Sequence, residues 1–166
     1  MPEKVTIEKA ERDKEQGKSP STQAGEFVRE EFHHVREGKH GARSPQQAIA
    51  IGLSKARRAG VKLGARKAGG STNRVRKQAE RDLARGLSGK RNVSPRRSRV
   101  TENALKRENR SSASKSALSR QTKGAARRRG RSSLHNAAMK AVRTKGKEGL
   151  RRAGQKAART RQGHAR

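Results

Sequence analysis

Apolar residues near the start of the chain recur at helical spacing in two separate stretches. The first stretch carries five of them on one side of a helix: Ala24, Phe27, Val28, Phe32 and Val35. This spacing predicts an amphipathic helix from about Ser21 to Glu37. Gly38 is suited to stop that helix, and Gly41 to help the chain turn.

The second stretch has sequence features of both a helix start and a helix end. Ser44 can cap the first free N–H groups, Pro45 suits the first helical position, and Gln47 completes a capping box. Five small or apolar residues then form one stripe: Ala48, Ile49, Gly52, Leu53 and Ala56. Gly60 suits the C-terminal cap of this helix, where glycine is favoured. The pattern predicts a helical hairpin over residues 21–63.

A hairpin with so few large apolar residues is a poor free-standing domain, since small cores need a staple, a metal ion or a partner. The chain has no cysteine, so a disulfide staple is excluded. We therefore expect residues 21–63 to form a homo-oligomer, to recruit a neighbouring segment as a third helix, or to dock on a partner.

Two residues differ in polarity from the helix face on which they lie: Ile51 is on a polar face, and Glu31 is on an apolar face. Ile51 is about 140° from Ala56, the centre of the apolar stripe, and it shares its face with Lys55 and Arg58. Ile51 is either part of a contact face for nucleic acid or a partner, or it covers a third helix or stands exposed alone. Glu31 lies among apolar residues, so it either pairs with a cation of the second helix or reaches water at the rim.

Three histidines stand near acidic residues in the first helix and the turn. His33 and His34 are adjacent and diverge on a helix, and His40 follows the turn. Two histidines four positions apart with a glutamate between them, the metalloprotease pattern, are absent. We interpret this segment as a solvated polar face, and we expect neither a metal ion nor any other cofactor.

Charge is divided unevenly along the 166 residues, which carry a net charge of +31. Residues 1–37 hold nine acids and seven bases, whereas residues 38–166 hold 38 bases and five acids. Apolar residues make up 28% of the chain and aromatic residues 1%. A composition this polar and this charged cannot bury enough surface to offset the entropy of ordering.

The expected fold is therefore mostly α, with a charged segment (1–20), the helical hairpin (21–63) and a basic region (64–166). We expect this basic region to be largely disordered, with short conditional helices rich in Ala, Lys and Arg. Five glycines are expected to break these helices: Gly64, Gly86, Gly130, Gly146 and Gly154. The related runs "KAVRTK" (140–145) and "KAARTR" (156–161) are interpreted as low-complexity drift rather than as an architectural repeat.

So positive a chain predicts a polyanionic partner, and the candidate contacts are mostly arginines. In the hairpin they are Ile51, Lys55, Arg57 and Arg58, and in the basic region Arg96, Arg97, Arg99, Arg127, Arg128, Arg129, Arg131, Arg151 and Arg152. The basic region has no aromatic residue on which to stack single-stranded bases. Duplex DNA is therefore favoured and RNA is possible.

The chain shows no sequence pattern typical of an enzyme. It has no phosphate-binding glycine loop, no zinc-ligand spacing and no plausible nucleophilic triad, so we expect no catalysis and no small-molecule substrate. No run approaches the length of a membrane span, and the first residues lack the apolar centre of a secretory signal. We expect a cytoplasmic, nucleoid-associated protein that does not bind membranes.

The run "GKHGARSPQQAIAIGLSKARRAG" (38–60) gives the segment 21–63 a resemblance to an uncharacterised bacterial family of small basic proteins, a domain of unknown function. The resemblance covers about a quarter of the chain and implies a module without naming an activity. In composition alone, the rest resembles the basic tails of histone-like and linker-histone-like proteins.

These observations favour a histone-like, sequence-tolerant DNA-binding protein that neutralises phosphates and bridges or compacts DNA. An alternative is a structural protein associated with ribosomes or RNA. A further alternative is an adaptor whose N-terminal part binds a protein.

Overall fold

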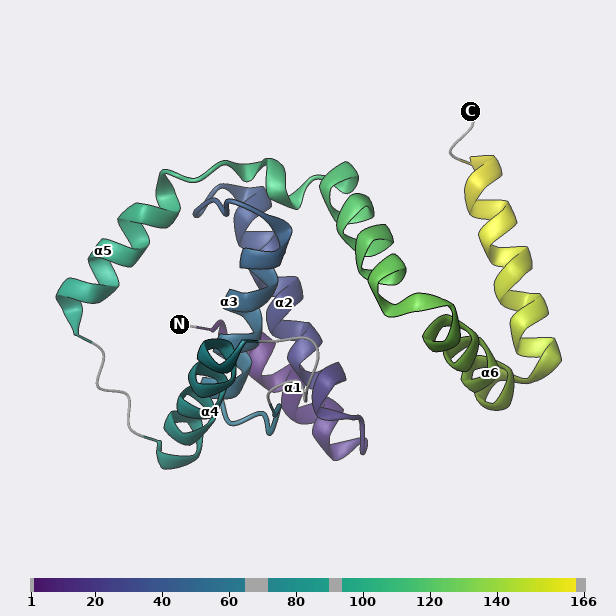
Figure 1. The fold of residues 1–166 in the computed structure, drawn as a ribbon, viewed down its shortest axis with the longest axis horizontal. Coiled ribbons are helices and arrows are strands. Elements are labelled where there is room, and N and C mark those ends of the chain that lie inside the picture. The colour runs from purple at the N-terminus through teal and green to yellow at the C-terminus, as the bar shows by residue number, and fades with distance from the viewer. Residues whose placement is uncertain (1, 65–71, 90–93, 164–166) are drawn as a thin grey trace. The chain divides into compact units, whose positions relative to one another are not determined.

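The computed structural model describes residues 2–64, 72–89 and 94–163, and the regular structure in these ranges is entirely helical. The elements are α1 (Lys4–Glu15), α2 (Pro20–Glu37), α3 (Pro45–Arg58), α4 (Asn73–Ser88), α5 (Pro95–Lys106), the short 3-10 helix η1 (Arg110–Ala113) and α6 (Lys115–Gly163) (Figure 1). The chain forms two compact units, residues 1–119 and 120–166. The mostly α fold class is thus confirmed.

The predicted hairpin is present as α2 and α3. Helix α2 begins one residue earlier than expected, because Pro20 takes the first helical position and the Ser19 side chain accepts a hydrogen bond from the Thr22 N–H. It ends at Gly38, which adopts the left-handed conformation (φ 79°) that favours glycine.

Helix α3 starts at the predicted cap. The Ser44 hydroxyl accepts from the Gln47 N–H at 3.2 Å. The Gln47 side chain accepts in turn from the Arg43 N–H at 2.8 Å, one residue earlier than a capping box requires. At the other end, Val61 folds back, donates to the Ala56 carbonyl and joins the core.

The core consists of two small apolar clusters along α2. The first contains Ala10, Ala24, Phe27, Ala56 and Val61, and the second Phe32, Val35, Ala42, Ala48 and Ala113. Helices α2 and α3 approach closely at Gly52, where an added Cβ would lie 2.7 Å from the Val28 Cα atom. The contact therefore requires glycine at position 52.

Neighbouring segments of the chain cover the hairpin, so the expectation of a recruited helix is confirmed. Helix α1 packs against α2 and buries Ala10, and α4 packs against α3 and buries Ala79 and Asp82. Gly86, expected to break a helix, lies inside α4, where an added Cβ would collide with the Arg57 carbonyl oxygen. Here the glycine permits close packing.

The segment from α5 to η1 closes over the turn between α2 and α3. The Gly41 N–H donates to the Leu105 carbonyl at 2.9 Å, and the Ala42 N–H donates to the Asn109 carbonyl at 3.1 Å. Ala113 is buried against the second cluster, and the Arg36 side chain donates to its carbonyl. These contacts fix the turn to a segment some seventy residues away in the sequence.

The expectation that residues 64–166 are largely disordered is wrong for the described part of that range, because α4, α5, η1 and α6 are formed there. Part of the reason is that α4 and η1 supply apolar surface that the hairpin lacks. In α6 the reason is local, because alanine, arginine, lysine and leucine are strong helix formers. Residues 65–71, 90–93 and 164–166 lie outside the described residues.

Helix α6 is divided into three helical segments by two glycines. Gly130 (φ 77°, ψ 169°) and Gly146 (φ 65°, ψ 174°) adopt nearly the same non-helical conformation. Both were expected to break helices and do so, whereas Gly154 continues the helix. Among the described residues of α6, none is fully buried.

Gly52→Ala should destabilise the folded protein by about 1–3 kcal/mol, because the new methyl group meets the backbone of α2. Gly25→Ala is the matched control. Gly25 lies within α2 with nothing within 4 Å of an added Cβ, so the exchange should stabilise by about 0.5–1 kcal/mol. Urea unfolding followed by circular dichroism measures both, and equal effects would contradict the close approach.

Candidate nucleic-acid interface and a buried charge cluster

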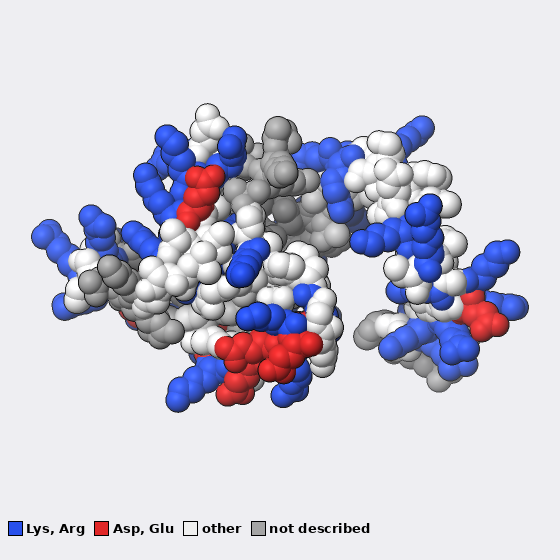
Figure 2. Space-filling view, turned by 90° about the horizontal axis from the view of Figure 1, so that it is seen from below, with Lys and Arg blue, Asp and Glu red and all other residues white. Residues whose placement is uncertain are grey.

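The predicted basic contacts of the region after residue 64 all lie on helices and are exposed. Arg96, Arg97 and Arg99 belong to α5, and the other six belong to α6: Arg127, Arg128, Arg129, Arg131, Arg151 and Arg152. On the face drawn in Figure 2, lysine and arginine side chains project at many places, and acidic side chains gather in few. These arginines are available to a polyanion.

The predicted contacts in the hairpin have partners within the protein. Lys55 lies 2.7 Å from Glu31 Oε2, and Arg57 Nε donates to the Leu63 carbonyl at 3.0 Å. Arg58 Nε donates to Asp82 Oδ1 at 2.9 Å. Lys55 and Arg57 are half-buried and Arg58 is exposed, and each makes a contact that holds the first unit together.

Ile51 is partly buried, and its face of α3 is the one against which α4 packs. Ser54 and Arg58, one and two turns further along that face, both donate hydrogen bonds to Asp82 of α4. This arrangement supports the interpretation of Ile51 as cover for a third helix.

Asp82 is the centre of the contact between α3 and α4. Its side chain is 1% exposed and accepts hydrogen bonds from Ser54, Arg58 and Gln78. Burial raises the pKa of Asp82, but the three hydrogen bonds and the charge of Arg58 outweigh it, so the pKa lies below the ordinary value. The carboxylate thus stays ionised within the contact.

Gly130 and Gly146, which divide α6, are sixteen residues apart, and each begins one copy of a sequence repeat of that length. The segment 130–145 reads "GRSSLHNAAMKAVRTK" and the segment 146–161 reads "GKEGLRRAGQKAARTR". They are identical at seven of sixteen positions, and each begins at a glycine with the same backbone conformation. Since structure and sequence share one period, the interpretation of the related runs as low-complexity drift is wrong.

A first copy precedes these two, at residues 114–129 ("SKSALSRQTKGAARRR"). Leucine occupies the fifth position of all three copies, as Leu118, Leu134 and Leu150. Basic residues occupy the second, fourteenth and sixteenth positions in every copy: Lys115, Arg131, Lys147, Arg127, Arg143, Arg159, Arg129, Lys145 and Arg161. We call residues 114–161 the repeat array. Its first and last shared cations stand about 21 Å apart along each helical segment.

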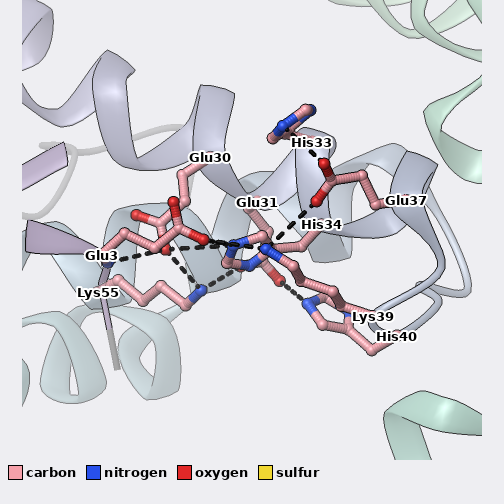
Figure 3. A network of polar contacts seen from close by, with 9 residues as sticks. All are labelled: Glu3, Glu30, Glu31, His33, His34, Glu37, Lys39, His40 and Lys55. Atoms are coloured by element: carbon pink, nitrogen blue, oxygen red, sulfur yellow. Dashed lines mark hydrogen bonds and ion pairs between the residues drawn. The ribbon is translucent and has the colours of Figure 1, made fainter. Parts of the chain in front are cut away.

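A second group of charged residues lies inside the first unit, between α2, α3 and the turn (Figure 3). Glu31 of α2 is fully buried and lies between Lys55 and His40, and the Glu30 side chain is 3% exposed and lies 3.5 Å from Lys55. Of the two alternatives for Glu31, pairing with a cation of the second helix is the one observed. We call Glu30, Glu31, His34, His40 and Lys55 the buried charge cluster.

Glu3 and Lys39 close this cluster on its exposed side. Hydrogen bonds from His34 and Lys39 lower the pKa of Glu3 to about 2. Hydrogen bonds to Glu3 and Glu37 raise the pKa of Lys39 above its ordinary value. Both groups therefore stay charged, and they tie the residue before α1 to the end of α2.

The interpretation of the three histidines as a solvated polar face is wrong for His34, which is buried, and for His40, which is half-buried beside Glu31. His33 does diverge from His34, and it pairs with the exposed Glu37 outside the cluster. The chain turns back after Gly38, however, and brings His40 beside His34 and Glu31, with one potential ligand atom of each within 4.8 Å of the others. Gly38, placed between His34 and His40 in the sequence, is a usable signal for such a return, because a glycine at a helix end lets the chain turn back.

Comparison of the chain with protein-family models, curated proteins and solved structures found no match. The resemblance of residues 21–63 to a family therefore stays a prediction. Among the described residues, no helix is long and apolar enough to cross a membrane.

Asp82→Asn should destabilise the protein by about 1–3 kcal/mol at neutral pH, because a buried, charge-assisted acceptor is lost. The pKa of Asp82 is lowered in the folded protein, so its contribution is present above the ordinary pKa of 3.8 and is lost as the pH falls through the lowered folded pKa. The variant should lack that portion of the acid dependence. Denaturant unfolding across a pH series measures it.

Glu102→Gln is the control for this prediction, because Glu102 pairs with Lys106 on the surface of α5. Stability at neutral pH should stay unchanged. If the two variants had the same neutral-pH stability, Asp82 would not anchor α4.

Proposed function

We propose that the protein binds nucleic acid without sequence preference, and duplex DNA in particular, through the repeat array of α6. One observation carries the proposal: the array presents the same exposed cations three times, at matching positions of three helical segments. Exposed cations of this kind neutralise backbone phosphates, a contact that does not depend on the base sequence.

The shared cations of the array, apart from Lys115, lie in the second unit, where acids are few. Residues 120–166 carry 16 lysines and arginines and one acid, Glu148. Among the described residues, Glu148 lies 3.6 Å from Arg152, and both side chains are exposed. The repulsion among so many like charges is relieved when phosphates replace the counterions, and this release drives binding.

The exposure of α6 also supports a polyanionic partner. No described residue of the helix is fully buried, and Leu134, Met139 and Val142 are each at least 40% exposed. Short helices without tertiary packing are marginal in water alone. Neutralising the charge would stabilise the same helices on a nucleic-acid surface.

The aromatic residues favour a duplex over a single strand. Phe27 and Phe32 are the two aromatic residues of the phenylalanine, tyrosine and tryptophan class, and both are buried in the first unit. Single-strand binders stack bases on such rings. Binding by the array would therefore be directed to the phosphate backbone.

The first experiment measures binding of fluorescent duplex DNA and duplex RNA to the full chain across a salt series. A triple variant, Arg127→Gln, Arg143→Gln and Arg159→Gln, removes one shared cation from each copy. The slope of log affinity against log salt should become less negative by about 2–3, because each phosphate contact on B-DNA contributes about 0.9.

The matched control removes three exposed cations from α1, by Lys4→Gln, Lys9→Gln and Arg12→Gln. Its slope should change by less than about 1. Equal changes in the two triple variants would mean that net charge, and not the array, determines binding. No binding to either duplex would refute the proposed function, and tighter binding to RNA would favour the ribosome-associated alternative.

A further inference from the structure

The hydrogen bonds of His40 restrict what its second ring nitrogen can do. His40 Nδ1 lies 3.0 Å from the Gly41 carbonyl oxygen. A carbonyl oxygen only accepts, so Nδ1 carries a proton and donates. In a neutral ring, Nε2 then has a lone pair and no proton. That lone pair faces Glu31 Oε1 at 3.3 Å, where two acceptors would repel each other.

The carboxylate of Glu31, which faces His40, also lacks a hydrogen-bond donor among the described residues. The Glu31 side chain is fully buried, and neither carboxylate oxygen accepts a hydrogen bond of good geometry from any residue that the structure describes. Lys55 approaches Oε2 at 2.7 Å, which leaves Oε1 facing His40. A buried carboxylate oxygen without a donor is costly, so this position calls for a cation.

The charges of the cluster also do not balance. Glu30 and Glu31 are both buried carboxylates, and Lys55 is the lysine that pairs with both of them in the described part of the chain. Glu3 and Lys39 neutralise each other at the rim. With neutral histidines the cluster holds one negative charge more than its cations offset, and residues 1–37 as a whole are the acidic part of this basic chain.

We propose that Glu31, His34 and His40 bind one divalent transition metal ion of the zinc class. One carboxylate oxygen and two imidazole nitrogens are a donor set that zinc accepts, with a fourth position left for water. Zinc–ligand bonds of about 2.0–2.1 Å place tetrahedral ligand atoms about 3.3 Å apart. Glu31 Oε1 and His40 Nε2 are already at that separation, and His34 lies within 4.8 Å of both.

The residues around this site hold its ligands as the outer partners of metal ligands do. Lys55 takes the second oxygen of Glu31, the Gly41 carbonyl fixes the ring of His40, and Glu3 Oε1 lies 2.9 Å from His34 Nε2. Such partners set the orientation and the tautomer of each ligand. A metal ion here would tie the end of α2 to the turn that precedes α3, as a staple for a small core.

The test is a titration of the full chain with zinc in competition with a chromophoric chelator. We expect one high-affinity zinc per chain, and we expect cobalt to give the intense visible absorption of a four-coordinate site. His40→Ala should weaken zinc binding by at least about tenfold, the effect that loss of even an outer partner has. His33→Ala is the matched control and should bind zinc like the unaltered chain, because His33 is exposed and pairs with Glu37.

Two further measurements keep the proposal open to refutation. Circular dichroism shows whether His40→Ala still folds, and Glu31→Gln provides a second variant that keeps the size of the side chain. Zinc should raise the melting temperature of the unaltered chain and not that of either site variant. If the unaltered chain bound no stoichiometric zinc, His40 Nε2 would carry a proton and pair with Glu31 instead, and the proposal would be wrong. It would also be wrong if His33→Ala weakened binding as much as His40→Ala.

Discussion

The ion pair between Glu31 and Lys55 is the interaction on which the first unit depends most. It joins α2 to α3 inside a core whose apolar clusters consist mainly of alanine and valine with two phenylalanines. A buried charge that loses its partner costs about 3–5 kcal/mol. A domain of this size is stable by only about 5–15 kcal/mol, so the pair and its neighbours decide whether the two helices stay together. The cover supplied by α1, α4 and η1 all rests on that hairpin.

The division of charge along the sequence has a structural meaning. Three acids of the first unit pair with cations of the same unit: Glu31 with Lys55, Asp82 with Arg58, and Glu3 with Lys39. The cations of α6 have almost no acids to pair with in their own unit. Cations therefore have two roles in this chain: Lys55 and Arg58 pair with acids that join helices, whereas the exposed arginines of α5 and α6 are available to a ligand.

The hairpin could be predicted from the sequence because its information is local. Ser44, Pro45 and Gly38 mark the helix ends wherever they occur, and the apolar stripe fixes which side packs. The packing of α4 and η1 could not be predicted in the same way, because Asp82 and Ala113 become informative only once distant partners are known. By composition alone, Asp82 and Ala113 do not differ from the rest of the basic region 64–166.

The buried cluster and the repeat array were missed for different reasons. His40 is separated from His34 by a turn, and helical spacing says nothing about residues beyond a turn. The two related runs can be aligned in the sequence. In a chain so rich in alanine and arginine, however, a partial match is weak evidence for a structural repeat. The matching conformations of Gly130 and Gly146 supplied the independent evidence that the period is real.

The sixteen-residue period has a consequence for how such a protein can change during evolution. Each copy begins at its own boundary and contributes between four and six net positive charges. Duplication or loss of one whole copy would alter the number of phosphate contacts stepwise, without touching the residues that fold the first unit. Point substitution alters affinity in small increments, whereas a change in copy number alters it by orders of magnitude in one event. A gene encoding such an array would be expected to vary in length between close relatives by multiples of forty-eight base pairs.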